Sequence, residues 1–333
     1  MKVTVIGGGV AGIQTALALK GLGLKPVIIE KEDTLGGKLR GWHKLFPTMT
    51  PVGEVLEPLL RELREQNIPI MASTEVLGIE TDGVITSHGK VESRATVVCS
   101  GFDLFDATLK EEYGYGIYDN VITSADLERM MNNGKVALVD GTQPRRIAFL
   151  HCVGSRDEKV QQRHCSKVCC VTGVKQAIEM RRWFPQSEIY NFYMDIRMFG
   201  SGYEEMYRSA QQEHGIQFIR GRISEAAPVP GGKVQIKAED TLIGRPLKMT
   251  VDMLILLIGM TAGCSNSHWA ECAGLEQSDS HFMRPLNVFE GNVRSALPNV
   301  FYAGTVTAPK TIGESLNEAN AVAFRVAEYL KGL

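Results

Sequence analysis

The stretch that decides the fold runs from Lys2 to Glu30, KVTVIGGGVAGIQTALALKGLGLKPVIIE. Residues 2–6 form a β-branched strand pattern, residues 13–22 a helical pattern, and residues 26–29 a second strand pattern. The turn between the first strand and the helix reads G-x-G-x-x-G, and Glu30 follows the last of these glycines by 18 residues. This order of strand, turn, helix and strand predicts an α/β fold with a parallel sheet that binds a dinucleotide.

Each residue of the glycine turn has a physical reason to be there. Gly7 permits the tight turn, Gly9 lets the backbone approach a pyrophosphate, and Gly12 lets the helix pack closely on the strand. The N-terminus of the helix attracts phosphates, and Glu30 accepts a hydrogen bond from a ribose hydroxyl. A glycine turn that binds nothing is the alternative, and the strand–turn–helix context disfavours it. The cofactor-binding candidates in this segment are Gly7, Gly9, Ala11, Gly12, Glu30 and Lys31.

Two further segments favour FAD over NAD as the bound dinucleotide. Leu35-Gly-Gly-Lys-Leu39 resembles the second glycine pair of the glutathione-reductase class of FAD proteins. Asn299-Val-Phe-Tyr-Ala-Gly304 resembles the strand that closes the flavin site in that class, although Thr305 stands where the class usually has aspartate. The helix that begins near Gly313 would direct its N-terminal N–H groups toward negative charge on a reduced flavin. The remaining candidate FAD contacts are Gly37, Lys38, Leu39, Val76, Ser100, Gly101, Gly304, Thr305, Lys310, Ile312 and Gly313.

A strand pattern that occurs twice in the sequence predicts two related lobes. Residues 76–101 and residues 234–259 each indicate short alternating strands that return to a buried strand ending at a glycine. The chain therefore resembles a two-dinucleotide-binding-domain flavoprotein of the glutathione/thioredoxin reductase type, with a FAD-binding Rossmann lobe and an inserted NAD(P)-lobe-like domain. The predicted FAD-binding domain is discontinuous, residues 1–143 and 250–333, and residues 144–249 form the inserted domain.

The inserted domain carries an unusual cysteine cluster. Four of the chain's seven cysteines fall within residues 152–170, spaced C-x12-C-x3-C-C. Cys152 follows an apolar strand pattern, and a helix is predicted to open with Cys165, Cys169 and Cys170. A second glycine fingerprint belongs at this place in reductases of this class, so we infer that the inserted domain has lost dinucleotide binding.

The chemistry of the four thiols favours an iron–sulfur cluster. Four thiolates near a helix N-terminus, with Arg156, Arg163 and Lys167 close by in sequence, suit an anionic four-iron, four-sulfur core, [4Fe–4S]. Structural zinc usually takes paired C-x2-C hooks, and a redox dithiol needs only two cysteines. These two sites and a set of four buried small hydrophobes stay open as alternatives.

Several motifs resemble those of the heterodisulfide reductase A-subunit family, over essentially the whole chain. They are Cys-Val-Gly-Ser-Arg-Asp (152–157), Cys-Ser-Lys-Val-Cys-Cys (165–170), Glu-Tyr-Gly-Tyr-Gly (112–116), Asn-Val-Ile-Thr (120–123) and Ala-Pro-Lys (308–310). The resemblance implies a [4Fe–4S] cluster close to FAD, a homodimer, and B-like and C-like heterodisulfide reductase subunits as partners. The metal ligands that it implies are Cys152, Cys165, Cys169 and Cys170.

Differences from the long form of that family indicate which of its members this chain resembles. The C-x2-C-x2-C-x3-C ferredoxin runs of the long methanogen form are absent. The chain therefore looks like a short form without ferredoxin domains, similar to the A-like subunit of the bacterial sulfur-oxidising heterodisulfide reductase-like complex. It is less like the corresponding flavoprotein subunit of a quinone-interacting membrane-bound oxidoreductase.

The composition of the chain limits its possible partners and its cellular location. A net charge of −2 gives no reason to expect nucleic acid as a partner, and the longest apolar run, Met253–Met260, is too short to span a bilayer. The chain opens directly on a strand pattern, so we expect no secretory signal and a cytoplasmic location. Thiols stay reduced in the cytoplasm, which favours metal-binding or redox-active cysteines over structural disulfides.

We therefore predict an oxidoreductase that passes electrons between FAD and a [4Fe–4S] cluster as one subunit of a larger complex. The complex would act in cytoplasmic sulfur-compound oxidation or disulfide redox chemistry. The sequence indicates no acid–base catalytic residue, because the expected role of the protein is to position and tune its cofactors. The alternatives are a self-sufficient NAD(P)H-dependent disulfide reductase, the quinone-interacting subunit, and a non-catalytic subunit whose centres are structural.

Overall fold

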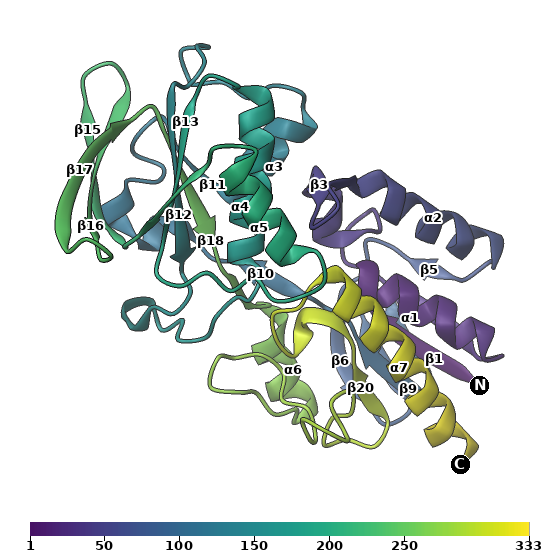
Figure 1. The fold of residues 1–333 in the computed structure, drawn as a ribbon. Coiled ribbons are helices and arrows are strands. Elements are labelled where there is room, and N and C mark those ends of the chain that lie inside the picture. The colour runs from purple at the N-terminus through teal and green to yellow at the C-terminus, as the bar shows by residue number, and fades with distance from the viewer. Residues whose placement is uncertain (333) are drawn as a thin grey trace. The chain divides into compact units, whose positions relative to one another are not determined.

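The computed structural model describes residues 1–332 and divides the chain into two compact units. Unit 1 contains residues 1–40, 52–103 and those from 261 onward, and unit 2 contains residues 41–51 and 104–260. The colour in Figure 1 follows the chain, so unit 1 holds its purple start and its yellow end. The division differs from the boundaries predicted at 143 and 250, because residues 41–51, 104–143 and 250–260 belong to unit 2.

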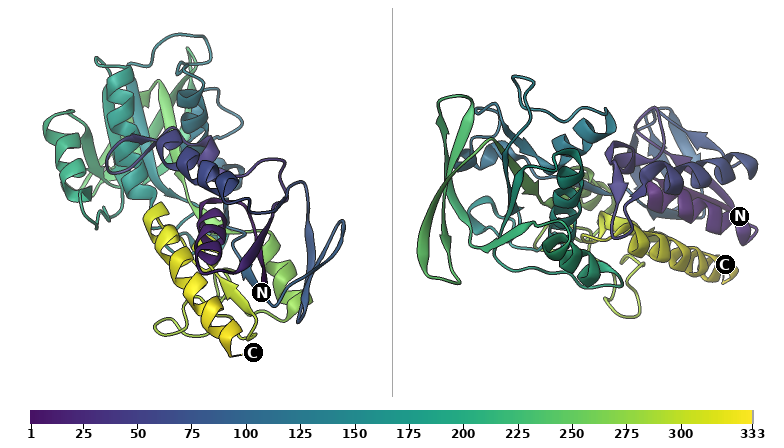
Figure 2. Two further views of the ribbon diagram at one scale, coloured as in Figure 1. Left: turned by 90° about the vertical axis from the view of Figure 1, so that its right-hand side faces the viewer. Right: turned by 45° about the horizontal axis from the view of Figure 1, so that its top comes forward.

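Unit 1 is built on a five-stranded parallel sheet in the order β20-β9-β1-β2-β5. The strands are β1 (Lys2–Ile6), β2 (Lys25–Ile29), β5 (Ile70–Met71), β9 (Ala95–Val98) and β20 (Val300–Tyr302). The helices are α1 (Val10–Gly21), α2 (Val52–Glu65), α6 (Ser265–Ala273) and α7 (Ile312–Lys331). Figure 2 shows α7 running beside α1. The antiparallel strands β6 (Val76–Glu80), β7 (Gly83–Thr86) and β8 (Gly89–Glu92) precede β9.

Unit 2 repeats this plan with a second five-stranded parallel sheet, in the order β11-β18-β12-β13-β14. Its strands are β11 (Val121–Thr123), β12 (Arg146–Val153), β13 (Glu188–Tyr193), β14 (Gln217–Arg220) and β18 (Met253–Ile258). Its helices are α3 (Ser124–Asn132), α4 (Cys169–Trp183) and α5 (Tyr203–Gln212). The antiparallel strands β15 (Ile223–Val229), β16 (Lys233–Asp240) and β17 (Arg245–Val251) precede β18.

Both faces of the sheet in unit 2 are buried, which explains its continuous apolar strands. In β12, Ile147 and Phe149 pack with the helices α3, α4 and α5, whereas Ala148 and Leu150 pack toward the strands β15, β16 and β17. Figure 1 shows the helices on one side of this sheet and the antiparallel strands on the other. The alternation of these four side chains therefore fills two separate cores.

Short elements complete the chain. The strands β3 (Lys44–Leu45) and β4 (Thr50–Pro51) pair in unit 2. The strands β10 (Phe102–Leu104) and β19 (Met260–Ala262) contain two of the four points where the chain passes between units. The 3-10 helices are η1 (Gly37–Gly41), η2 (Ala107–Leu109), η3 (Glu111–Tyr113), η4 (Glu158–Val160) and η5 (Gly304–Val306). No helix among residues 1–332 has both the length and the hydrophobicity to cross a bilayer.

The predicted fold class is confirmed, because two Rossmann-like parallel sheets each receive a strand from an antiparallel meander. One helix boundary was wrong. α4 begins at Cys169, so Cys165 lies in the preceding loop and does not share a helix face with Cys169. Lys167 has a φ of +62°, which a right-handed helix cannot contain, and the chain therefore enters the helix only after it.

Candidate functional site

The glycine turn of unit 1 needs two of its glycines for close packing. Gly7 has a φ of +100°, and a Cβ there would lie 2.5 Å from the carbonyl oxygen of Cys99. A Cβ on Gly12 would lie 1.8 Å from the carbonyl oxygen of Gly7. A Cβ on Gly9 would meet no atom within 4 Å. The turn therefore presents open space at Gly9, the position predicted to approach a pyrophosphate.

The second glycine pair folds onto this turn. The Gly36 amide donates to the Gly8 carbonyl at 2.8 Å, and a Cβ on Gly37 would lie 3.2 Å from the Cα of Gly9. Glu30 is buried at the end of β2, and its Oε2 accepts the Gly8 N–H at 2.5 Å. These contacts hold the predicted ribose-binding carboxylate beside the predicted phosphate-binding turn.

Segments from later in the chain reach the same edge of the sheet in unit 1. Gly304 has a φ of +78°, and a Cβ there would lie 2.7 Å from the Cβ of Ala11 in the first turn of α1. A Cβ on Gly101 would lie 3.8 Å from Thr305 Oγ1. The buried hydroxyl of Ser100, at the end of β9, has no hydrogen-bond partner within residues 1–332. An open glycine turn and an orphaned hydroxyl on one edge fit a bound FAD.

The predicted lysines have partners within the chain. Lys310 Nζ donates to the Gly304 carbonyl at 2.7 Å and pairs with Glu318 at 2.9 Å. Its ammonium therefore braces the loop that precedes α7. Lys38 Nζ lies 3.3 Å from Asp103 Oδ1. Lys31 is exposed, 4.0 Å from Glu32.

The other candidates also belong to unit 1. Val76 and Leu39 are buried, and Val76 belongs to a hydrophobic core. Ile312 and Gly313 begin α7, whose N-cap Thr311 forms a capping box with Glu314. A Cβ on Gly313 would meet no atom within 4 Å. The first turn of α7 therefore has room for a ligand.

The four clustered cysteines lie together in unit 2. Cys152 is near the end of β12 with a φ of +62°, Cys165 is in the loop, and Cys169 and Cys170 are the first two residues of α4. All are buried except Cys165, which is half-buried. Burial, followed by the charges of Cys170 and Cys165, raises the pKa of Cys152 to about 12. Burial and the other three thiols raise the pKa of Cys169 well above its ordinary value. Four thiols that affect one another in this way lie close together.

The arrangement does not suit a single metal ion. Within residues 1–332, no three or more His, Cys, Asp or Glu side chains are arranged to hold one. A tetrahedral zinc site with bonds of about 2.3 Å needs its sulfurs roughly 3.8 Å apart. A four-iron cluster binds one cysteine at each iron and spaces the sulfurs more widely. Four cysteines, three of them buried, match the number and type of ligands that a four-iron cluster needs.

The loop between β12 and α4, which is equivalent in position to the glycine turn of unit 1, packs against the end of β18. A Cβ on Gly259 would lie 2.3 Å from Ser155 Oγ and 2.7 Å from the Gly154 carbonyl. Ser166 is fully buried, and its Oγ accepts the Met260 N–H at 2.8 Å. The loop thus packs directly against the end of β18, which supports the inference that this unit has lost dinucleotide binding.

The remaining cysteines lie in unit 1 and are separate from one another in sequence. Cys99 is buried with its Sγ 3.9 Å from Thr15 Oγ1, and burial raises its pKa to about 12. Cys99 therefore packs in the interior of unit 1. Cys264 and Cys272 are exposed at the two ends of α6.

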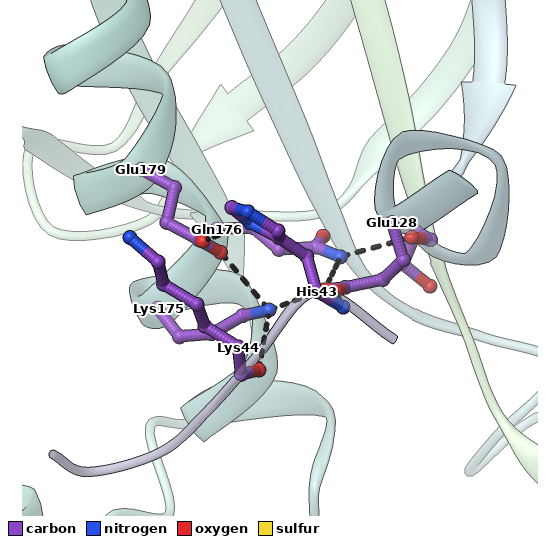
Figure 3. Close-up of polar contacts among 7 residues, drawn as sticks. His43, Lys44, Glu128, Lys175, Gln176 and Glu179 are labelled. Carbon is purple, nitrogen blue, oxygen red and sulfur yellow. Dashed lines mark hydrogen bonds and ion pairs between the residues drawn. The ribbon is translucent and has the colours of Figure 1, made fainter. Parts of the chain in front are cut away.

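A buried charged network in unit 2, which sequence reasoning missed, runs along α4 (Figure 3). The Lys175 ammonium contacts Glu128 of α3 and lies 3.0 Å from Glu179, and all three side chains are buried. His43 Nδ1 lies 2.8 Å from Glu179 Oε1. The members are His43, Lys44, Glu128, Lys175, Gln176 and Glu179. The i, i+4 spacing of Lys175 and Glu179 was visible in the sequence, but their partners from α3 and from residues 43–44 were not.

Two ion pairs beside the cysteines were also missed. Arg156 Nη2 lies 2.9 Å from Asp195 Oδ2, and Lys110 Nζ lies 2.8 Å from Asp157 Oδ2. The only sequence signal was the position of Arg156 and Asp157, four and five residues after the first clustered cysteine.

Comparisons with known proteins agree with this geometry. The family model described as pyridine nucleotide-disulphide oxidoreductase matches residues 1–323. The chain belongs to that family. Membership in the pyridine nucleotide-disulphide oxidoreductase family implies FAD as the cofactor, and the open glycine turn of unit 1 fits it.

Curated relatives include components of heterodisulfide reductases. The iron-sulfur A-subunit of the CoB–CoM heterodisulfide reductase of Methanocaldococcus jannaschii is 31% identical over 97% of this chain and 63% of its own length. The A-subunit of the H2:CoB-CoM heterodisulfide,ferredoxin reductase of Methanothermobacter thermautotrophicus is 30% identical over 98% of this chain and 63% of its own length. The predicted similarity to this kind of protein is confirmed, and the chain spans less than two thirds of these relatives.

Solved structures show the fold alone. Thioredoxin reductase of T. acidophilum matches with a TM-score of 0.69 and 16% identity, covering 99% of this chain and 98% of that one. Thioredoxin reductase of Lactococcus lactis matches with a TM-score of 0.70 and 14% identity, covering 100% and 99%. The sulfide:quinone oxidoreductase of Aquifex aeolicus matches with a TM-score of 0.62 and 17% identity, covering 99% and 77%.

Proposed function

We propose that this flavoprotein oxidoreductase is an electron-transfer subunit of a heterodisulfide reductase-like complex, holding FAD in unit 1 and a [4Fe–4S] cluster in unit 2. The observation that carries the proposal is the gathering of four thiols at the junction of β12 and α4. In unit 1 the corresponding junction, β1 to α1, is an open glycine turn. One chain thus offers a dinucleotide site and a separate four-thiol site.

Named residues would hold each group. Gly9 and the first turn of α1 would bind the pyrophosphate of FAD, Glu30 its ribose, and the first turn of α7 would lie at the flavin. Cys152, Cys165, Cys169 and Cys170 would hold the cluster. When bound, FAD exchanges two electrons and the cluster one, which suits transfer between two-electron and one-electron partners. The protein's contribution is to exclude water, fix the ligands and set the local charge.

The wider assignment rests on the similarity to the methanogen relatives. Their names describe them as parts of heterodisulfide reductases, and we propose B-like and C-like subunits as partners of this chain and a homodimer as its own assembly. We further propose that the chain is a short A-like subunit of the kind found in the bacterial sulfur-oxidising heterodisulfide reductase-like complex, and that it is located in the cytoplasm. The quinone-interacting subunit is the alternative within the same fold.

A self-sufficient NAD(P)H-dependent disulfide reductase is the second candidate, and the family name is in its favour. It requires a glycine turn that binds the pyrophosphate of NAD(P)H, and in unit 2 the loop of Gly154, Ser155 and Ser166 stands between β12 and α4 in place of such a turn. The geometry therefore favours a subunit that exchanges electrons with protein partners.

An anaerobic reductive titration separates the two candidates. We expect dithionite to bleach the flavin and the cluster reversibly, and a tenfold excess of NADH or NADPH to leave the flavin absorbance unchanged over minutes. Rapid bleaching by NADPH would support the self-sufficient reductase instead. Centres that never cycle reversibly would indicate a structural role.

A further inference from the structure

Two residues of the cysteine motif have no role as cluster ligands. Arg156 and Asp157 end the motif Cys-Val-Gly-Ser-Arg-Asp and open a short hairpin, residues 156–164. The Arg156 amide donates to the His164 carbonyl at 2.9 Å, and the backbones of Asp157 and Gln162 bond in both directions at 2.8 and 2.9 Å. Because this hairpin joins Cys152 to Cys165, it sets the separation of the first two candidate ligands.

Arg156 ties the hairpin to the fourth cysteine. Its Nη2 donates to Asp195 Oδ2 at 2.9 Å, and the backbone carbonyl of Asp195 accepts from Cys170 Sγ at 3.5 Å. The Arg156 guanidinium and the Cys170 thiol therefore contact the same residue, Asp195, which places a positive charge near this sulfur.

Asp157 anchors the same hairpin to the interior of unit 2. Its Oδ2 accepts from Lys110 Nζ at 2.8 Å and from Arg222 Nη2 at 2.7 Å. The side chains of Asp157 and Lys110 are only 4% and 3% exposed. Desolvation alone would raise the pKa of Asp157, but the hydrogen bonds from Lys110 and Arg222 lower it below its usual range. The anchor is therefore a buried ionic contact to two segments far from the motif.

We propose that Arg156 and Asp157 are positioning residues that hold the cysteine loop in the geometry a four-thiolate cluster needs, and that the positive charge of Arg156 raises the cluster's reduction potential. The inference rests on the proposed function, since it concerns the cluster assigned there. Reduction adds negative charge to the cluster, and a nearby cation stabilises the reduced form.

The test uses the anaerobically purified holoprotein and four variants, Arg156→Gln, Arg156→Lys, Asp195→Asn and Asp157→Asn. Two quantities are measured: the rate of iron loss to an excess chelator, and the midpoint potential by EPR-monitored titration. We expect iron loss to be about tenfold faster in Arg156→Gln, Asp195→Asn and Asp157→Asn, because residues that orient ligands affect metal retention by this order.

The direction of the shift in midpoint potential distinguishes an electrostatic effect on the cluster from a general loss of structure. Arg156→Gln removes a cation and is expected to lower the potential, whereas Asp195→Asn removes an anion and is expected to raise it. Arg156→Lys keeps the charge and is expected to hold the wild-type potential. Should Asp157→Asn fail to fold, the Arg156 and Asp195 variants still decide the question.

The matched control is Arg146→Gln. Arg146 pairs with Glu188 at 2.6 Å at the far end of β12, with exposure similar to that of the Arg156 pair. The substitution Arg146→Gln should change neither the rate of iron loss nor the midpoint potential. The inference is overturned if Arg156→Gln and Asp195→Asn lose iron at the wild-type rate with unchanged potentials while the wild type holds four irons. A wild type without iron would instead overturn the proposed function, and the inference with it.

Discussion

The two units differ in the connection between one strand of the parallel sheet and the helix that follows it. In unit 1, β1 passes into α1 through a short turn in which Gly7 and Gly12 leave no room for a side chain and Gly9 leaves space above it. In unit 2, β12 and α4 are separated by a loop that contains the clustered cysteines and packs on Gly259. One junction is open and ready for phosphate, and the other is filled and rich in thiols. In the proposed function, the same architecture would therefore serve two kinds of cofactor site, depending on the connection between one strand and one helix.

The largest expected effect is the loss of the cluster without loss of the flavin. Cys169→Ala removes a buried thiol at the start of α4. We expect iron to fall from about four per chain to near zero, because the proposed cluster would need all four thiolate ligands to stay bound. FAD content should stay at the wild-type level, because the glycine turn lies in unit 1. Cys272→Ala, an exposed cysteine, is the control, and equal loss of flavin and iron would show that the two sites are not independent.

The buried network along α4 should have the largest effect on stability. Lys175→Met leaves the buried carboxylates of Glu128 and Glu179 without their ammonium partner, and we expect a loss of about 3–5 kcal/mol in unfolding free energy. Lys90→Met is the control, because Lys90 pairs with Asp82 on an exposed surface and should cost less than about 1 kcal/mol. Chemical denaturation measures both, and equal losses would contradict the network's role.

A glycine-to-alanine substitution at each place compares the open turn of unit 1 with the filled loop of unit 2. Gly259→Ala places a methyl group 2.3 Å from Ser155 Oγ, and we expect a destabilisation of about 1–3 kcal/mol from overpacking. Gly9→Ala meets no atom, so the stability of the FAD-free protein should change by less than about 0.5 kcal/mol. Its affinity for FAD should fall about tenfold or more, a loss of about 1.4 kcal/mol. Unchanged FAD affinity in Gly9→Ala would contradict the assignment of the open turn.

The smallest effect concerns acid stability of the cysteine loop. The folded pKa of Asp157 is lowered from 3.8, so its ion pairs contribute stability that is fully present above the unfolded pKa and is lost as pH falls through the folded pKa. The stability difference between the wild type and Asp157→Asn should therefore be constant above about pH 5 and shrink below about pH 4. A difference that persists unchanged at pH 3 would show that packing, not charge, is responsible.

The sequence predicted those features that depend on local pattern. The strand at residues 2–6 and the two meanders that lead into β9 and β18 follow from alternation and glycine position. The start of α4 was not predicted, because a positive φ is uncommon for a lysine and the residue type at position 167 does not indicate it. The partners of Lys310 and of Asp157 were also beyond reach, because Glu318 and Lys110 meet them only through the fold.

The most direct test of the account is the content of iron, acid-labile sulfide, zinc and flavin per chain in anaerobically purified wild-type protein. The account predicts about four irons and four sulfides with one FAD and no zinc. Zinc without iron, or one FAD with none of these, would contradict it, because the four cysteines would then be a scaffold and the chain's redox function would rest on the flavin alone.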